Sequence, residues 1–178
     1  MSTHYRRLSM AQGSSLCAVG LLAGLTLLVV VPHVKLFPVD LIFIFAAWFC
    51  FWFFSHDLAH HIVGRIVGVG FRYYFLGRST ITKLNLPIVS NLLKVVPVLG
   101  LKIDKSSLKS ISPNGLRVMY ASGAVSSMLL PWIVVPPGYA IGLPFGILIT
   151  LLTVTNDVFT LYFSPKVGDI HHARMVRR

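Results

Sequence analysis

Three ionisable side chains with the spacing of a metal site follow the most apolar and aromatic stretch of the chain, Leu41 to Phe54. His56 and His60 are four residues apart, so a helix places both imidazoles on one face with Asp57 beside them. This is the spacing of H-E-x-x-H, in which two histidines hold zinc and the carboxylate is a general base. The pattern predicts a zinc site with Asp57 in the position of the glutamate.

A simpler interpretation is that these histidines lie where a helix leaves the membrane and are stabilised there by hydrogen bonds, with help from Asp57. Ionisable side chains inside membrane segments are costly to bury, and they mark functional sites more often than not. We therefore favour the metal site.

The composition is that of an integral membrane protein. The 178 residues are 55% hydrophobic and 12% charged, with a mean hydropathy of +0.77, whereas about a quarter of the residues in soluble domains are charged. We expect the lipid bilayer to be the main surrounding of the chain. Cys17 and Cys50 have no C-x-x-C partner, so neither a disulfide framework nor a thiolate zinc site is indicated.

Sixteen Lys and Arg stand against five acidic residues, and their distribution predicts the orientation. Basic residues precede the first apolar segment, fill the middle of the chain and close it, whereas the connection 31–38 carries only Lys35 and 136–144 carries no charge. The positive-inside rule then places both termini and the middle segment in the cytoplasm. With the charge explained in this way, no nucleic-acid partner is expected.

The sequence predicts an all-α membrane protein with about four transmembrane helices, long enough to cross a core of about 30 Å. These helices are 14–31, 39–63, 114–135 and 140–163. The first is interpreted as a retained anchor because no small-residue cleavage site follows it. Segment 64–113 has no run long enough to span and should lie at the cytoplasmic interface, with a strand at 71–77 and a second strand or re-entrant piece in 84–101.

A third ligand is available near the end of the chain. The second and fourth predicted helices finish on the same side of the membrane, which lets Asp169 meet His56 and His60 across 113 residues of sequence. Three protein ligands and an open fourth position are typical of catalytic zinc.

With these residues in place, the chain resembles the site-2 protease family of intramembrane zinc metalloproteases over roughly residues 15–175. The sequence His56-Asp57-Leu58-Ala59-His60 matches the family's H-E-x-x-H, and the region 117–130 is similar to its small-residue helix. Pro165 and Asp169 occupy the places of the proline and aspartate in its Asn-x-x-Pro and Asp-Gly motif.

The resemblance implies one zinc ion per chain, bound by His56, His60 and Asp169, with Asp57 as the catalytic base. It also implies hydrolysis of peptide bonds in a transmembrane protein substrate. Three residues differ from the family's motifs. Asp57 replaces the glutamate of H-E-x-x-H, Tyr162 replaces the asparagine of Asn-x-x-Pro, and Ile170 replaces the glycine of Asp-Gly. These departures leave open a catalytically inactive relative that serves as a membrane scaffold or as a subunit of a complex.

A di-iron membrane oxygenase is a further alternative, because such enzymes carry histidine boxes. The candidate residues are His56, His60, His61, His171 and His172. Two iron ions in that family need about eight ligands, so this alternative is less favoured.

Overall fold

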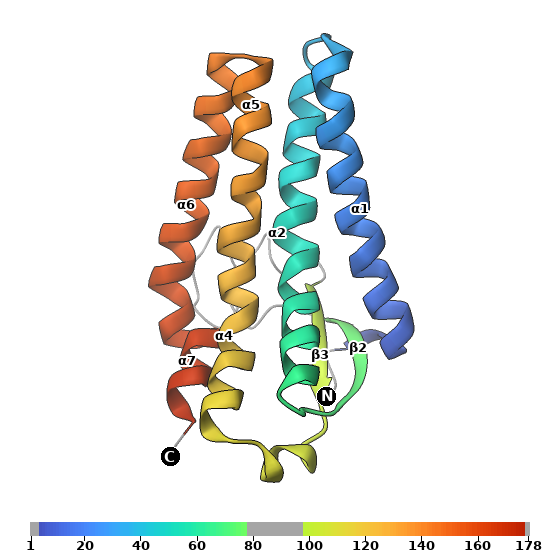
Figure 1. The fold of residues 1–178 in the computed structure, drawn as a ribbon, viewed down its shortest axis with the longest axis vertical. Helices are drawn as coiled ribbons and strands as arrows, with labels where there is room; N and C mark the ends of the chain where they lie inside the picture. The colour runs from blue at the N-terminus through green and yellow to red at the C-terminus, as the bar shows by residue number, and fades with distance from the viewer. Residues whose placement is uncertain (1–3, 78–97, 177–178) are drawn as a thin grey trace.

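The four predicted spans form a bundle of long helices in the computed structural model, which describes residues 4–77 and 98–176 (Figure 1). Four helical segments are long and apolar enough to cross a membrane, which confirms the predicted fold class and a multi-pass membrane protein. They are α1 (Met10–Val34), α2 (Val39–Ile66), the segment Pro113–Ile141 and α6 (Leu143–Val167). The third segment consists of α4 (Pro113–Leu129), η3 (Leu130–Val134) and α5 (Val135–Ile141). A short helix, α7 (Asp169–Met175), follows α6.

All four spanning segments end beyond their predicted last residues, whereas α6 begins at Leu143, three residues later than predicted, because residues 140 and 141 belong to α5. Caps and tolerated prolines set several of these ends. Ser9 and Gln12 form a capping box at the start of α1, with the Gln12 amide donating to Ser9 Oγ at 3.2 Å. Ser112 caps α4 in the same way, 3.1 Å from the amide of Gly115. Pro32 and Pro165 lie inside the last turns of their helices instead of ending them, as membrane helices tolerate.

A small antiparallel sheet lies beside the lower part of α2 in Figure 1, in the order β1-β2-β3. β2 (Phe71–Gly77) confirms the predicted strand, and β3 (Val98–Ile103) covers the end of the second predicted piece, most of which lies outside the described residues. A short 3-10 turn, η2 (Ser107–Ser110), leads from β3 toward α4. β1 (His4–Leu8) is not predicted by the sequence, because a five-residue strand forms only by pairing with the free edge of β2.

α2 is the central helix, because it packs against α1 on one side and against α4 on the other (Figure 1). Its upper half contributes Ile44 and Ala47 to a core shared with Val31, Val134 and Ile149. In that core, the indole Nε1 of Trp48 donates to Thr153 Oγ1 of α6 at 2.9 Å. The lower half of α2 carries the histidine cluster.

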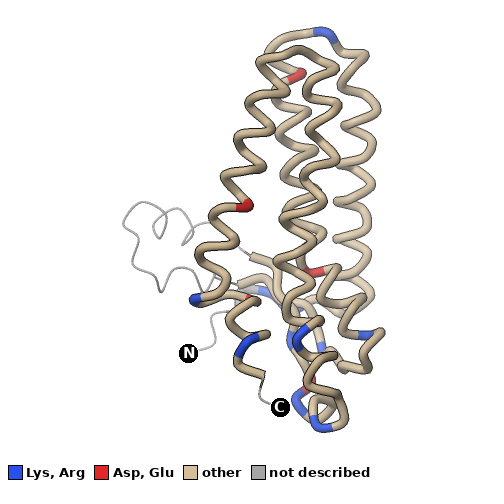
Figure 2. Tube along the Cα trace, turned by 60° about the vertical axis from the view of Figure 1, so that its left-hand side comes forward, with Lys and Arg blue, Asp and Glu red and all other residues tan. Residues whose placement is uncertain are grey.

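Lys and Arg gather at the end of the bundle that also holds the sheet, η2 and α7 (Figure 2). Lys35 lies in the connection between α1 and α2, which is at the opposite end (Figure 1). We call the first of these the basic end. The distribution is the one that the alternation of charged and uncharged connections in the sequence predicts.

Candidate metal centre

His56, His60 and Asp169 come together where the lower part of α2 meets the start of α7. The Nε2 atoms of His56 and His60 lie 3.2 and 3.4 Å from Asp169 Oδ2. Among the residues that the structure describes, these three form the one group of His, Cys, Asp or Glu side chains able to hold a metal ion, with ligand atoms all within 4.8 Å of one another. The proximity expected from the sequence is therefore present.

Asp169 is positioned by the break between α6 and α7. The helix stops at Gly168, whose amide donates to the Ser164 carbonyl at 3.0 Å. Ser164 Oγ then accepts from the Ile170 amide at 3.1 Å, which starts the next helix in a new direction. A Cβ at Gly168 would lie 2.9 Å from Ser164 Cα, so glycine is needed for this turn. The result is an Asp169 side chain directed at α2.

His60 makes a hydrogen bond through the ring nitrogen that does not face Asp169, and this bond fixes which nitrogen carries the proton. Nδ1 lies 2.8 Å from the carbonyl oxygen of Met119, an acceptor only, so Nδ1 is the donor. In the neutral ring, Nε2 then holds a lone pair and faces Asp169. A histidine ligand commonly donates its second nitrogen to a backbone carbonyl in this way.

His56 is oriented by a hydroxyl of the same helix, α4. Its Nδ1 lies 3.4 Å from Ser127 Oγ, and Ser127 Oγ lies 3.0 Å from the carbonyl of Gly123. Since the single hydroxyl proton goes to that carbonyl, Ser127 accepts from His56 Nδ1. The Nε2 lone pair of the neutral His56 ring is thereby also turned toward Asp169.

When both rings are neutral, two imidazole lone pairs and one carboxylate face the same point, and a metal ion between them, or a proton on one ring, would relieve their repulsion. Ligands about 2.0–2.1 Å from a tetrahedral zinc ion lie about 3.3 Å from each other. The distances of 3.2 and 3.4 Å between histidine nitrogen and carboxylate oxygen fit that spacing. The donor set, two nitrogens and one oxygen, also suits zinc.

Asp169 is ionised in this surrounding. Burial acts to raise its pKa, but the hydrogen bonds and the charge that His56 and His60 provide when they are protonated outweigh burial, so the pKa of Asp169 lies well below the ordinary value of an aspartate. The centre therefore offers an anionic oxygen to a cation.

Gly123 of α4 makes room for the ring of His60. A Cβ at this position would overlap the imidazole at its Nε2, Cδ2 and Cε1 atoms. The small residues around Ala121 to Ser127 suggest helix packing when only the sequence is considered, and α4 does pack on α2, with Ser126 Oγ donating to the Ser55 carbonyl at 3.2 Å. The structure adds a role that the sequence analysis missed, because Gly123 and Ser127 set the positions of the two imidazoles.

Asp57, the residue predicted to be the base, lies next to this group but is not one of its members. It is buried, with 6% of its surface exposed, and its carboxylate accepts no hydrogen bond from residues 4–77 and 98–176. It interacts electrostatically with His56, His60 and Asp169. Its charge also acts on Cys17 and Tyr74, which lie toward α1 and the sheet.

The remaining histidines of a possible di-iron site point elsewhere. His61 Nδ1 is 2.8 Å from Ser14 Oγ, and its ring lies edge-on to Phe71 and Tyr74. His172 packs against Tyr120 with ring centroids 5.7 Å apart. No second group of three ligand side chains forms in the described part of the chain, so the geometry favours a single ion.

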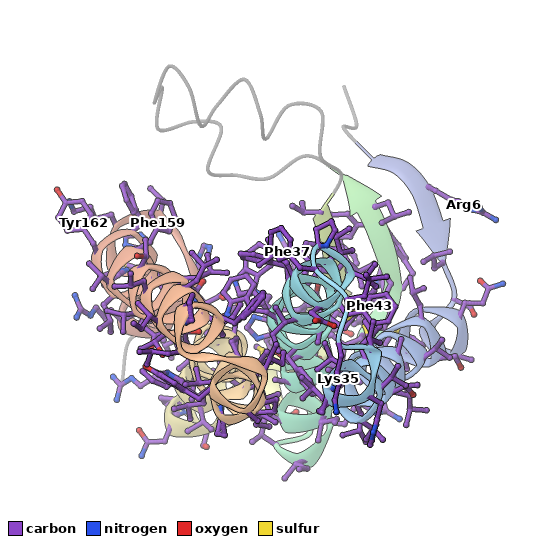
Figure 3. The ribbon with its side chains drawn as sticks, turned by 90° about the horizontal axis from the view of Figure 1, so that it is seen from above. Arg6, Lys35, Phe37, Phe43, Phe159 and Tyr162 are labelled. Carbon is purple, nitrogen blue, oxygen red and sulfur yellow. The ribbon has the colours of Figure 1, made fainter. Side chains whose placement is uncertain are left out.

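Tyr162, which stands in the place of the family's asparagine, faces away from the centre. Figure 3 shows Tyr162 and Phe159 on the outer side of α6, and the Tyr162 ring lies 3.3 Å from Lys166 Nζ. Asn156 instead reaches inward, since its Nδ2 donates to the Ser127 carbonyl at 3.0 Å. Asn156, six residues before Tyr162, is therefore the residue of this part of α6 that contacts Ser127, which orients His56.

Comparison with known proteins identifies no relative. No protein-family model, curated protein or solved structure matches the chain. The argument for its function therefore depends on the geometry of the candidate centre.

We expect Gly123→Ala to displace the His60 ring and to weaken zinc binding by about 10- to 100-fold, the range seen when residues that orient metal ligands are changed. The measurement is zinc affinity of the purified protein by competition with a chelating dye. Gly142→Ala is the matched control, because its Cβ meets no atom closer than 3.6 Å. Equal zinc affinity in the two variants would contradict the role of Gly123.

Proposed function

We propose that the chain is an intramembrane zinc metalloprotease of the site-2 type, with one zinc ion held by His56, His60 and Asp169. The observation that carries the proposal is the convergence of two Nε2 lone pairs on the Asp169 carboxylate, 3.2 and 3.4 Å away. Three protein donors leave a fourth position for water or substrate, as in catalytic rather than structural zinc sites. A zinc ion here would polarise a peptide carbonyl and make water nucleophilic at neutral pH.

The exposure of the three side chains supports a site that reactants can reach. About 35% of the His56 side chain and 24% of the Asp169 side chain are exposed, whereas His60 is 12% exposed. His60 is thus the buried anchor, and the open side of the centre lies at His56 and Asp169.

In this proposal Asp57 moves the proton. As a base it takes a proton from the water that attacks the carbonyl carbon, and it then gives the proton to the amine nitrogen as the C–N bond breaks. Its free carboxylate oxygens support this role, because no hydrogen bond within the described residues competes for them.

The depth of the centre supports a membrane-embedded substrate. His60 and His56 lie six and ten residues before Ile66, the last residue of α2, which is about 9 and 15 Å along a helix axis. A peptide bond at that depth belongs to a transmembrane segment that has unwound locally, because a helical peptide group is already hydrogen-bonded and shielded.

We also propose that the basic end faces the cytoplasm, with both termini on that side. The support is the clustering of Lys and Arg at one end of the bundle (Figure 2) together with the positive-inside rule. The metal centre would then lie nearer the cytoplasmic face of the membrane.

The first test is metal content. Purified wild-type protein should contain one zinc ion per chain by mass spectrometry of the metal, and His56→Ala or Asp169→Ala should lose it, because each removes one of only three donors. His61→Ala is the matched control, since it removes an adjacent imidazole that points to Ser14. Two irons per chain would instead support the oxygenase, and a folded wild type that binds no metal would support the scaffold.

The second test separates catalysis from metal binding. Asp57→Ala should keep zinc but slow cleavage of a reconstituted single-span substrate by about 100-fold or more, the usual contribution of a general base. Asp57→Glu, which restores the longer carboxylate, should retain activity. The protease proposal fails if Asp57→Ala cleaves as fast as wild type.

Orientation is tested by thiol labelling in intact cells with a membrane-impermeant maleimide. Lys35→Cys should be labelled from outside, and Lys109→Cys only after the membrane is permeabilised, because the two lysines stand at opposite ends of the bundle. The wild-type chain is the control, since Cys17 is buried and Cys50 is half-buried. The reverse pattern would show that the basic end faces outward.

A further inference from the structure

A second cavity, of about 540 Å³, lies at the basic end on the opposite side of α2 from the metal centre. It is bounded by the first turns of α1, the last turns of α2 and the start of β2. Most of its wall is apolar and is formed by Met10, Ala11, Ile62, Ile66 and Phe71. The volume is within the range of about 300–1,000 Å³ that is usual for small-molecule sites.

The polar part of the wall consists of Ser14, His61 and Arg65. Ser14 Oγ is 2.8 Å from His61 Nδ1 and 3.5 Å from the Tyr74 hydroxyl, which fixes the His61 ring against α1. The second nitrogen of that ring, Nε2, has no hydrogen-bond partner among the described residues. The cavity therefore holds an oriented imidazole with an unused polar atom.

Arg65 is the charged residue of this wall, and its guanidinium forms no ion pair or hydrogen bond with any residue of 4–77 or 98–176. By contrast, Arg72 pairs with Asp104 at 3.0 Å, and Arg117 donates to the Val176 carbonyl at 3.1 Å. None of the described residues that line the cavity is acidic. An anion would thus find an unpaired cation and no opposing charge.

Part of the apolar wall is exposed on the outer surface of the bundle. Ile62 and Ile66 are 51% and 78% exposed, although they belong to a helix that is long and apolar enough to span a membrane. They flank Arg65 within one turn at the end of α2. An arginine between exposed isoleucines at the end of a spanning helix is at the depth where hydrocarbon meets headgroups.

We propose that this cavity binds an anionic phospholipid, with the phosphate on Arg65 and His61 and the upper part of an acyl chain against Met10, Ile62 and Ile66. The wall combines a cation with an apolar surface, so the ligand that fits it combines an anion with an apolar tail. Basic pockets between transmembrane helices at a membrane surface are suited to such headgroups. The bound lipid would bridge α1, α2 and β2. The proposal is independent of the proposed protease function, since none of these residues belongs to the metal centre.

The test uses the full chain in nanodiscs of phosphatidylcholine that contain a small fraction of photoreactive phosphatidylglycerol. Adducts are mapped and quantified by peptide mass spectrometry. We expect them within residues 10–14 and 61–71, and we expect unlabelled phosphatidylglycerol to compete for them. Phosphatidylcholine and millimolar inorganic phosphate should compete poorly.

Three variants make the test specific. Arg65→Gln should reduce labelling at least about fivefold, the change expected for one basic residue at a lipid surface. Ala11→Phe should reduce it by filling the cavity while the charge is kept, and exposed Ala11 leaves room for folding. Lys109→Gln removes an exposed charge from the same end, outside the cavity, and should leave labelling unchanged. Zinc content, measured in parallel, should be the same in all variants.

Four outcomes would overturn the proposal. Equal labelling by photoreactive phosphatidylcholine would show that the headgroup charge is not recognised. Full competition by inorganic phosphate would show a site for free anions. A loss in Lys109→Gln equal to that in Arg65→Gln would show diffuse attraction by the basic end. Unchanged labelling in Ala11→Phe would place the lipid outside the cavity.

Discussion

The structure depends on holding two imidazole lone pairs against a carboxylate inside an apolar bundle. In water such an arrangement relaxes, because each group takes its own hydrogen bonds from solvent. Here α4 prevents relaxation by binding Nδ1 of each ring, through the Met119 carbonyl at 2.8 Å and the Ser127 hydroxyl at 3.4 Å. These contacts orient both rings, and a metal cation bound between the rings and Asp169 would satisfy all three groups.

This constraint explains why α4 is built from small residues. An ordinary side chain at Gly123 would occupy the position of the His60 ring, and a larger residue at Ser127 would remove the acceptor for His56. The turn at Gly168 serves the same arrangement from the other side, because it starts α7 where Asp169 reaches α2. α4 and the turn between α6 and α7 are thus shaped around two side chains of α2.

α2 also separates two different environments through neighbouring histidines. His60 and His61 are adjacent, yet successive residues of a helix point about 100° apart, so one ring faces α4 and the other faces α1 and the sheet. The first environment is polar and contains Asp169, whereas the second is a mostly apolar cavity with Arg65, which has no partner among the described residues. The ionisable cluster at the end of α2 therefore has two functions in our proposals, and the same helix positions both.

The sequence by itself determined the four spans, the strand at 71–77 and the pairing of His56 with His60, because hydropathy, β-propensity and helical spacing are local properties of neighbouring residues. It also indicated Asp169, since an aspartate at the edge of an apolar segment needs a partner. Only the tertiary structure decided that Gly123 and Ser127 orient the rings, that Asn156 rather than Tyr162 faces inward, and that residues 4–8 add a strand to β2. Those features depend on which helix faces pack together and on which strand edge is free, and such contacts join residues far apart in the chain.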